Sequence, residues 1–129
     1  MTILTLRLTF VANGSSHIVN WHAFDNGKSI GQRGSENGCI IRDEEHVNGA
    51  RITLERDGHT PFAITCGIYG WMVHTRFFGT EPEARSEFER MRSELSRIMS
   101  TIRRAADPEA NSKSQVVFEF ISKFVEEFP

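Results

Sequence analysis

The sequence has few of the features that place a chain in a special class. Only two of its 129 residues are cysteine, Cys39 and Cys66, and neither belongs to a CxxC pair, so nothing predicts a disulfide framework. No stretch approaches the roughly 18 apolar residues of a membrane span. The N-terminal MTILTLRLTF lacks a basic leader, so we expect no signal peptide. These absences favour a cytoplasmic chain with reduced cysteines.

An excess of one charge is also missing. The chain has fifteen Lys and Arg and seventeen Asp and Glu, so its formal net charge is −2. This charge gives no electrostatic reason to expect nucleic acid or an anionic membrane as partner. The arginines of residues 85–104 are interleaved with glutamates, which is typical of a solvated helix face. A chain of this length predicts a single domain, residues 1–129.

Catalytic and ligand-binding motifs are absent as well. The glycines of residues 25–38 lack phosphate-loop spacing, and we interpret them as turn makers in an irregular connection. No GxSxG elbow is present. The densest set of potential metal ligands is Asp-Glu-Glu-His at residues 43–46, but zinc-binding helices need two histidines one turn apart. We interpret this set as a solvated acidic turn and expect no metal or other cofactor.

The sequence does contain patterns that predict a series of short strands. Leu4, Leu6, Leu8 and Phe10 alternate with polar residues, the period of a half-buried strand. Turn residues such as Asn48-Gly49 separate further apolar stretches. The predicted strands are residues 4–10, 17–24, 39–41, 50–56, 61–66 and 71–78.

The turns of residues 50–78 are chosen by matching apolar faces, because a slip of one residue turns every side chain of a strand to the other face. A loop at residues 57–59 pairs Leu54 with Phe62. A loop at residues 67–70 pairs Cys66 with Trp71 and Ile64 with Val73. These pairings predict an apolar face that includes Trp71, Val73 and Phe77.

Two helices are expected after the strands. Thr80-Glu81-Pro82-Glu83 is a capping box with proline in the first turn. An apolar stripe then recurs at spacings of four and three, formed by Ala84, Phe88, Met91, Leu95, Ile98 and Ile102. The second helix begins near Ser112, and its wide apolar face requires cover in this chain or in a partner. We therefore predict an α+β fold: a mainly antiparallel sheet of five or six strands within residues 1–79, followed by helices at 80–106 and 112–128. The first helix packs on one sheet face.

The same pairings place a group of six residues on the opposite sheet face, around the small side chains of Ala63 and Thr65. These residues are Arg51, Thr53, Met72, His74, Arg76 and Phe78. Three interpretations stay open. The patch binds a polar or anionic small ligand, it is covered by a protein partner or second subunit, or the second helix covers it within the chain.

We expect no catalytic residue. Cys66 could pair with His74 or His59 as nucleophile and base, but the face assignment points Cys66 inward and His74 outward, and a buried cysteine is commonly an inert hydrophobe. The sequence favours a non-enzymatic binding or regulatory protein of the adaptor or immunity type, acting through protein–protein contacts as a homodimer. The alternative is a small-ligand-binding protein or enzyme that uses the polar face around His74 and Arg76.

Overall fold

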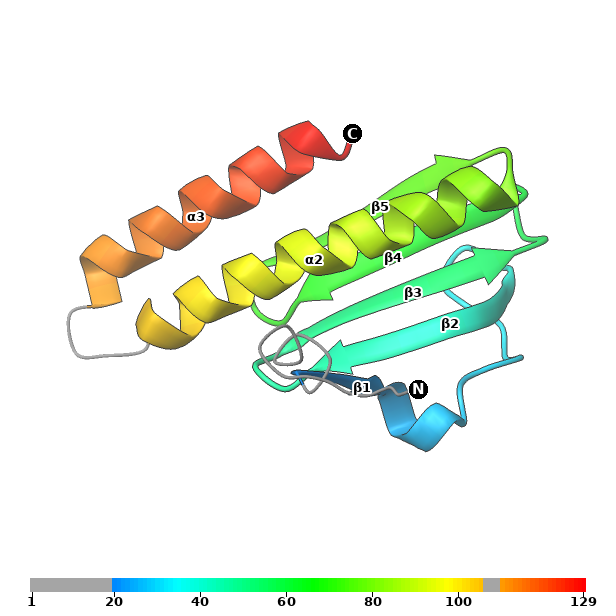
Figure 1. Cartoon of the computed structure of the whole chain (residues 1–129), viewed down its shortest axis with the longest axis horizontal. Helices are drawn as coiled ribbons and strands as arrows, with labels where there is room; N and C mark the ends of the chain where they lie inside the picture. Colours follow the sequence, from blue (N-terminus) through cyan, green and yellow to red (C-terminus); the bar gives the residue numbers. More distant parts are fainter. Residues whose placement is uncertain (1–19, 106–109) are drawn as a thin grey trace, which may run out of the picture.

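A computed structural model describes residues 20–105 and 110–129, and within these ranges it confirms the α+β fold (Figure 1). Five strands form one antiparallel sheet in the order β1-β2-β3-β4-β5, and two helices follow it. The elements are β1 Trp21–Ala23, the short 3-10 helix η1 Phe24–Gly27, β2 Cys39–His46, β3 Ala50–Arg56, β4 Phe62–Ile68, β5 Met72–Phe78, α2 Glu81–Ala105 and α3 Ala110–Glu127. The strand predicted at residues 4–10 lies outside the described residues.

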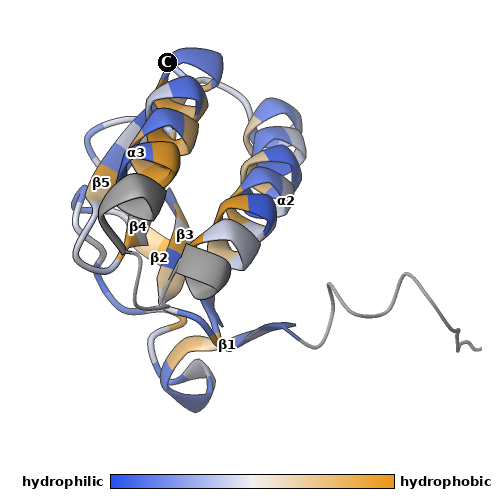
Figure 2. Cartoon of the chain, turned by 90° about the vertical axis from the view of Figure 1, so that its left-hand side faces the viewer, coloured by the Kyte–Doolittle hydropathy of each residue, from blue (hydrophilic) through white to orange (hydrophobic). Residues whose placement is uncertain are grey.

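Both helices lie on the same side of the sheet, which we call the inner face (Figures 1 and 2). Ile52, Leu54 and Ile64 alternate along β3 and β4 toward this face and are completely buried. Since side chains alternate along a strand, the intervening residues point to the opposite, outer face. The apolar core therefore lies between the sheet and the helices.

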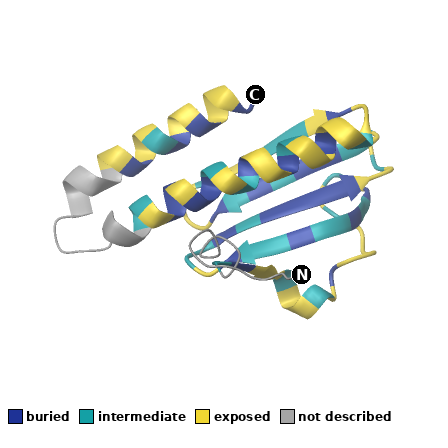
Figure 3. Cartoon of the chain, in the orientation of Figure 1, coloured by how far each residue is buried: buried dark blue, intermediate teal, exposed yellow. Residues whose placement is uncertain are grey.

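Helix α2 begins at Glu81, directly after the threonine predicted to cap it. Its predicted apolar stripe is confirmed, because Phe88, Met91 and Leu95 are fully buried while the intervening residues are exposed or half-buried (Figure 3). Ala84 and Ile98 complete the buried stripe, and Ile102 packs against it. The spacing of four and three brings these side chains onto one side of the helix.

Helix α3 lies on the β5 side of α2 (Figure 2). Val117, Ile121, Phe124 and Phe128 are buried in the shared core. The chain itself therefore covers most of the wide apolar face predicted for the second helix, while Val125 stays 39% exposed.

The inner side of β2 carries charges in place of apolar side chains. Arg42 and Glu44 project from β2 and bond to Glu89 and Arg92 of α2, with Arg42 Nη1 lying 2.7 Å from Glu89 Oε2. The Arg42 guanidinium also lies 4.2 Å from the centre of the Phe88 ring. A network of several half-buried charges is stronger than an isolated surface pair, so this network holds the β2 side of the sheet to α2.

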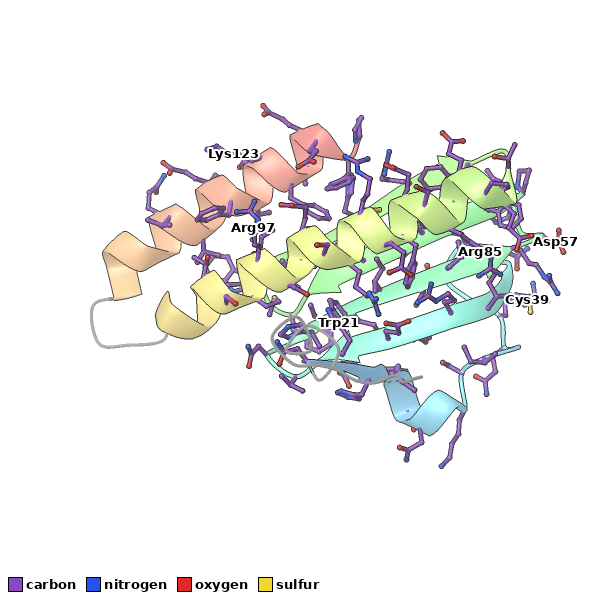
Figure 4. All side chains as sticks on the ribbon, in the orientation of Figure 1. Trp21, Cys39, Asp57, Arg85, Arg97 and Lys123 are labelled. Carbon is purple, nitrogen blue, oxygen red and sulfur yellow. The ribbon has the colours of Figure 1, made fainter. Side chains whose placement is uncertain are left out.

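Trp21 joins the first strand to the same helix (Figure 4). Its indole Nε1 donates a hydrogen bond to Ser96 Oγ at 2.7 Å, and its ring meets the His46 ring edge-on at 5.0 Å between centroids. Burial, followed by the nearby charge of His22, lowers the pKa of His46. His46 therefore stays neutral in this apolar setting, where its Nδ1 accepts the Asn48 amide.

The predicted register between β3 and β4 is wrong by two residues. Leu54 lies opposite Ile64 rather than Phe62, and Phe62 lies opposite Arg56. A shift of two residues leaves each side chain on its predicted face, so the apolar face of β3 and β4 is as expected.

The predicted register between β4 and β5 is wrong by three residues, which reverses the faces of β5. Cys66 lies opposite His74 rather than Trp71, and Ile64 lies opposite Arg76. Strand β4 continues through Gly67 to Ile68, and the turn is made at Gly70, whose φ of +84° favours glycine. As a result Val73 points to the outer face instead of the core.

Replacing Leu95 by alanine tests the packing of α2. Leu95 is fully buried, so Leu95→Ala should lower the free energy of unfolding by about 2–5 kcal/mol, measured by urea denaturation. Arg97→Ala, at an exposed position on the same helix, serves as the control and should change stability far less. A Leu95→Ala loss no larger than that of the control would contradict the packing of this helix on the sheet.

Candidate functional site

The six residues of the sequence-predicted patch do not share one face. Four of them lie on the inner face and belong to β5, namely Met72, His74, Arg76 and Phe78, whereas Arg51 and Thr53 of β3 lie on the outer face. The structure therefore divides the predicted patch into two separate groups.

His74 lies beneath α3. Its Nε2 is hydrogen-bonded to the backbone carbonyl of Phe128, and its ring meets the ring of Phe124 edge-on at 6.3 Å. The prediction that this histidine points outward is wrong, because the β5 register turns it toward the helices. Its observed contacts connect the last strand to the last helix.

Arg76 also has structural partners. Its Nη1 donates to Glu87 Oε1 at 2.7 Å, and its Nε donates to the carbonyl oxygen of Pro129 at 3.0 Å. Burial raises the pKa of Glu87, but hydrogen bonds from Arg76 and Arg90 outweigh burial and lower it overall. The alternative site proposed around His74 and Arg76 is thus occupied by contacts within the chain.

Cys66 and His74 are direct cross-strand neighbours on the inner face, contrary to the expectation that they point apart. The thiol is almost inaccessible, and burial raises the pKa of Cys66 to about 12 despite the opposing charge of Arg76. Because the thiolate is the nucleophilic form, this environment supports the predicted inert role.

The acidic set at residues 43–46 forms the end of strand β2 rather than the solvated turn that was predicted. Alternation along the strand separates its members. Asp43 and Glu45 lie on the outer face, while Glu44 and His46 lie on the inner face. Within residues 20–105 and 110–129, no three His, Cys, Asp or Glu side chains are grouped to hold a metal ion.

A buried carboxylate holds the residues before β2 against the outer face. The Asp43 side chain is completely buried, and it accepts a hydrogen bond from Ser29 Oγ at 2.7 Å. Arg51 donates two further bonds from Nε and Nη2, at 2.9 and 2.6 Å. The guanidinium of Arg51 stacks on the Phe24 ring, 3.5 Å from its centre. Asp43 therefore fixes both Arg51 and the segment of residues 28–38, which we call the outer loop.

A second buried carboxylate, Glu55, anchors the tip of the outer loop. It accepts the backbone amides of Glu36 and Gly38, the latter at 2.9 Å. A side chain at Gly34 would overlap the carboxyl group of Glu55, so glycine is required there for close approach. The outer-loop glycines that were interpreted as turn makers thus also let the backbone surround Glu55.

The outer loop forms one wall of a cavity of about 800 Å³, which we call the outer cleft. Its floor contains Thr53, Thr65 and Gly67, and its far wall is the β4–β5 turn. Strand β4 presents only small side chains to this face, Ala63, Thr65 and Gly67, and these leave room for the cleft. This volume falls within the usual range of small-molecule sites.

The charges around the outer cleft are balanced. Arg33 and Arg51 line it, but Arg51 is paired with Asp43 and the buried carboxylate of Glu55 also lines the cavity. Tyr69 donates from its hydroxyl to Glu45 at 2.7 Å, and burial, with this bond, raises the pKa of Tyr69 to about 12. With no net charge the cleft favours a neutral, partly apolar group over an anion.

Exposed apolar side chains lie beside the outer cleft. Val73 is 79% exposed, Phe77 is 53% exposed and Trp71 is 40% exposed. All three were predicted to face the core. The alternating small residues of β4 were a visible signal of open space on the outer face, but only the observed register places Val73 and Phe77 on that face.

Comparisons with protein-family models, curated proteins and solved structures gave no significant match. In the described part of the chain no helix has the length and apolar character needed to cross a membrane. Any functional conclusion therefore depends on the geometry alone.

Removing the carboxylate of Glu55 should release the outer loop. Glu55→Ala leaves two backbone amides without their acceptor, which costs about 1–3 kcal/mol of stability, and it should speed tryptic cleavage after Arg33. Limited proteolysis followed by mass spectrometry measures this rate. Glu94→Ala, at a more exposed carboxylate on α2, is the control. Equal cleavage rates in wild type and Glu55→Ala would show that Glu55 does not hold the loop.

Proposed function

We propose that this chain is a non-enzymatic, cytoplasmic binding protein that acts through protein–protein contacts and forms a homodimer. The observation that carries the proposal is the apolar surface along β5, where Val73 and Phe77 project into solvent from the outer face and the exposed Trp71 comes directly before the strand. Contiguous exposed apolar side chains mark interaction sites more often than scattered ones do. Aromatic residues are also enriched in protein interfaces.

The polar side chains that were candidates for catalysis bond to other parts of the chain, which supports a binding role over an enzymatic one. His74 bonds to Phe128, Arg76 bonds to Glu87, and Asp43 bonds to Arg51. Each of these side chains stabilises the fold by joining two separate elements. A reaction at any of them would have to break a contact that holds the chain together.

The outer cleft supports a second candidate function, the binding of a small neutral molecule. Its volume of about 800 Å³ and its threonine-lined floor suit a ligand with an apolar body and a few hydrogen-bonding groups. This candidate replaces the alternative site around His74 and Arg76, which contacts within the chain occupy.

Native mass spectrometry distinguishes the two functions. For the homodimer we expect a species of twice the 14.7 kDa chain mass, with no additional bound mass, and a population that rises with protein concentration. A monomer that retains a small molecule would contradict the homodimer and favour ligand binding in the outer cleft. Heating or acidification before injection separates a bound molecule from a covalent modification.

A further inference from the structure

Strand β5 is one of the two edge strands of the described sheet. It pairs with β4 along its whole length, Met72–Phe78, and no strand within the described residues pairs with its other side. Edge strands are usually protected by charged side chains, proline, a bulge, short length or a covering helix. Strand β5 has seven residues, contains neither proline nor lysine, and keeps a regular register with β4. Its one inward-pointing arginine, Arg76, is already paired with Glu87. Its outer backbone groups can therefore accept another strand.

The outer side chains of β5 are arranged symmetrically. Val73 and Phe77 lie two residues before and two residues after Thr75, and both project to the outer face. They are 79% and 53% exposed. In an antiparallel pair centred on Thr75, each of these positions would lie opposite the other.

An apolar surface also lies on the helix side of this edge. Helix α3 packs beside α2, and its Phe120 and Glu127 face that helix, since Arg97 lies over the Phe120 ring and Arg90 bonds to Glu127. The helical period places Phe118 and Val125 on the opposite flank of α3. These two are 59% and 39% exposed, and because α3 lies on the β5 side of α2 (Figure 2), they face away from α2 toward the open edge.

We propose that a second copy of this chain pairs with β5 in antiparallel orientation, with the two-fold axis at Thr75. Val73 then packs against Phe77 of the partner subunit, and the two sheets become continuous. On the inner side the C-terminal ends of the two α3 helices, each carrying Val125, approach each other. This inference rests on the proposed homodimer and specifies the surface through which it forms.

The symmetry of the strand favours a second copy over an unrelated partner. A two-fold interface uses the same patch on both subunits and must be self-complementary, and an aliphatic residue opposite an aromatic one is a favourable cross-strand pair. The side chains on the inner face are compatible with this register. There His74 lies opposite Arg76 of the partner subunit, and the charge of Arg76 is already paired with Glu87 at 2.7 Å.

A charge exchange tests the register. Val73→Asp and Phe77→Lys, made singly, should each raise the dimer dissociation constant about tenfold or more, the effect of removing a central interface side chain. The double variant places each aspartate opposite a lysine and should restore the dimer. Analytical ultracentrifugation measures these constants, circular dichroism confirms the fold, and Val47→Asp, at an exposed apolar residue in the β2–β3 turn, is the control.

A cross-link provides a second, independent test. In the proposed pair the two copies of residue 75 lie about 4.5–5.5 Å apart between Cα atoms, within reach of a disulfide. In a Cys39→Ser background, Thr75→Cys should form a covalent dimer on mild oxidation, whereas Ser93→Cys on the exposed side of α2 should not. In one outcome the wild type forms a dimer, but the double variant dissociates as readily as the single variants and Thr75→Cys does not cross-link. That combination would overturn the β5 pairing while leaving the homodimer intact. A wild-type monomer would refute both.

Discussion

The antiparallel ladder between β4 and β5 is the constraint on which the rest of the structure depends. By placing Cys66 opposite His74 and Ile64 opposite Arg76, it turns the polar side chains of the last strand toward α2 and α3. The same ladder turns Val73 and Phe77 to solvent. One register thus decides both how the C-terminal helix is attached and which surface of the sheet remains apolar and exposed.

The polar groups that this register brings inside are satisfied by specific partners. Arg76 is amphipathic, so its stem can lie among apolar side chains while its charged end reaches a partner; here the guanidinium lies 4.9 Å from the Phe78 ring centre and bonds to Glu87. On the other side of the sheet, Asp43 and Glu55 are buried and bonded to the outer loop. Ion pairs and buried carboxylates therefore hold the last strand and the outer loop in place, whereas the apolar stripe of α2 packs in the core.

Much of the fold follows from sequence periodicity. The stripe from Ala84 to Ile98 predicts the buried side of α2, and the alternation of Ile52 and Leu54 predicts the inner face of β3. The β3–β4 register was wrong by two residues without consequence, because side chains repeat every two residues along a strand. The β4–β5 register was wrong by three, and the odd number reversed the face of every residue in β5.

The candidate site was not predictable for the same reason. Trp71, Val73 and Phe77 are the more apolar set of the last strand, so a pattern-based assignment places them in the core. The structure instead gives that place to Met72, His74, Arg76 and Phe78. The residues that follow α3 supply backbone carbonyls for the polar pair, and α2 supplies a carboxylate. Such partners come from elements about ten to fifty residues away, and local patterns carry no information about them.

What remains after these contacts is an open strand with Val73 and Phe77 exposed on its outer face, and the functional proposals depend on that surface. The surface exists only if His74 points inward. A solution NMR experiment that measures nuclear Overhauser effects from the His74 imidazole tests this directly. We predict effects to the ring protons of Phe124, which the structure places 6.3 Å away between centroids. Effects from His74 to the side chains of Thr53 or Arg51 on the outer face, with none to Phe124, would contradict the account.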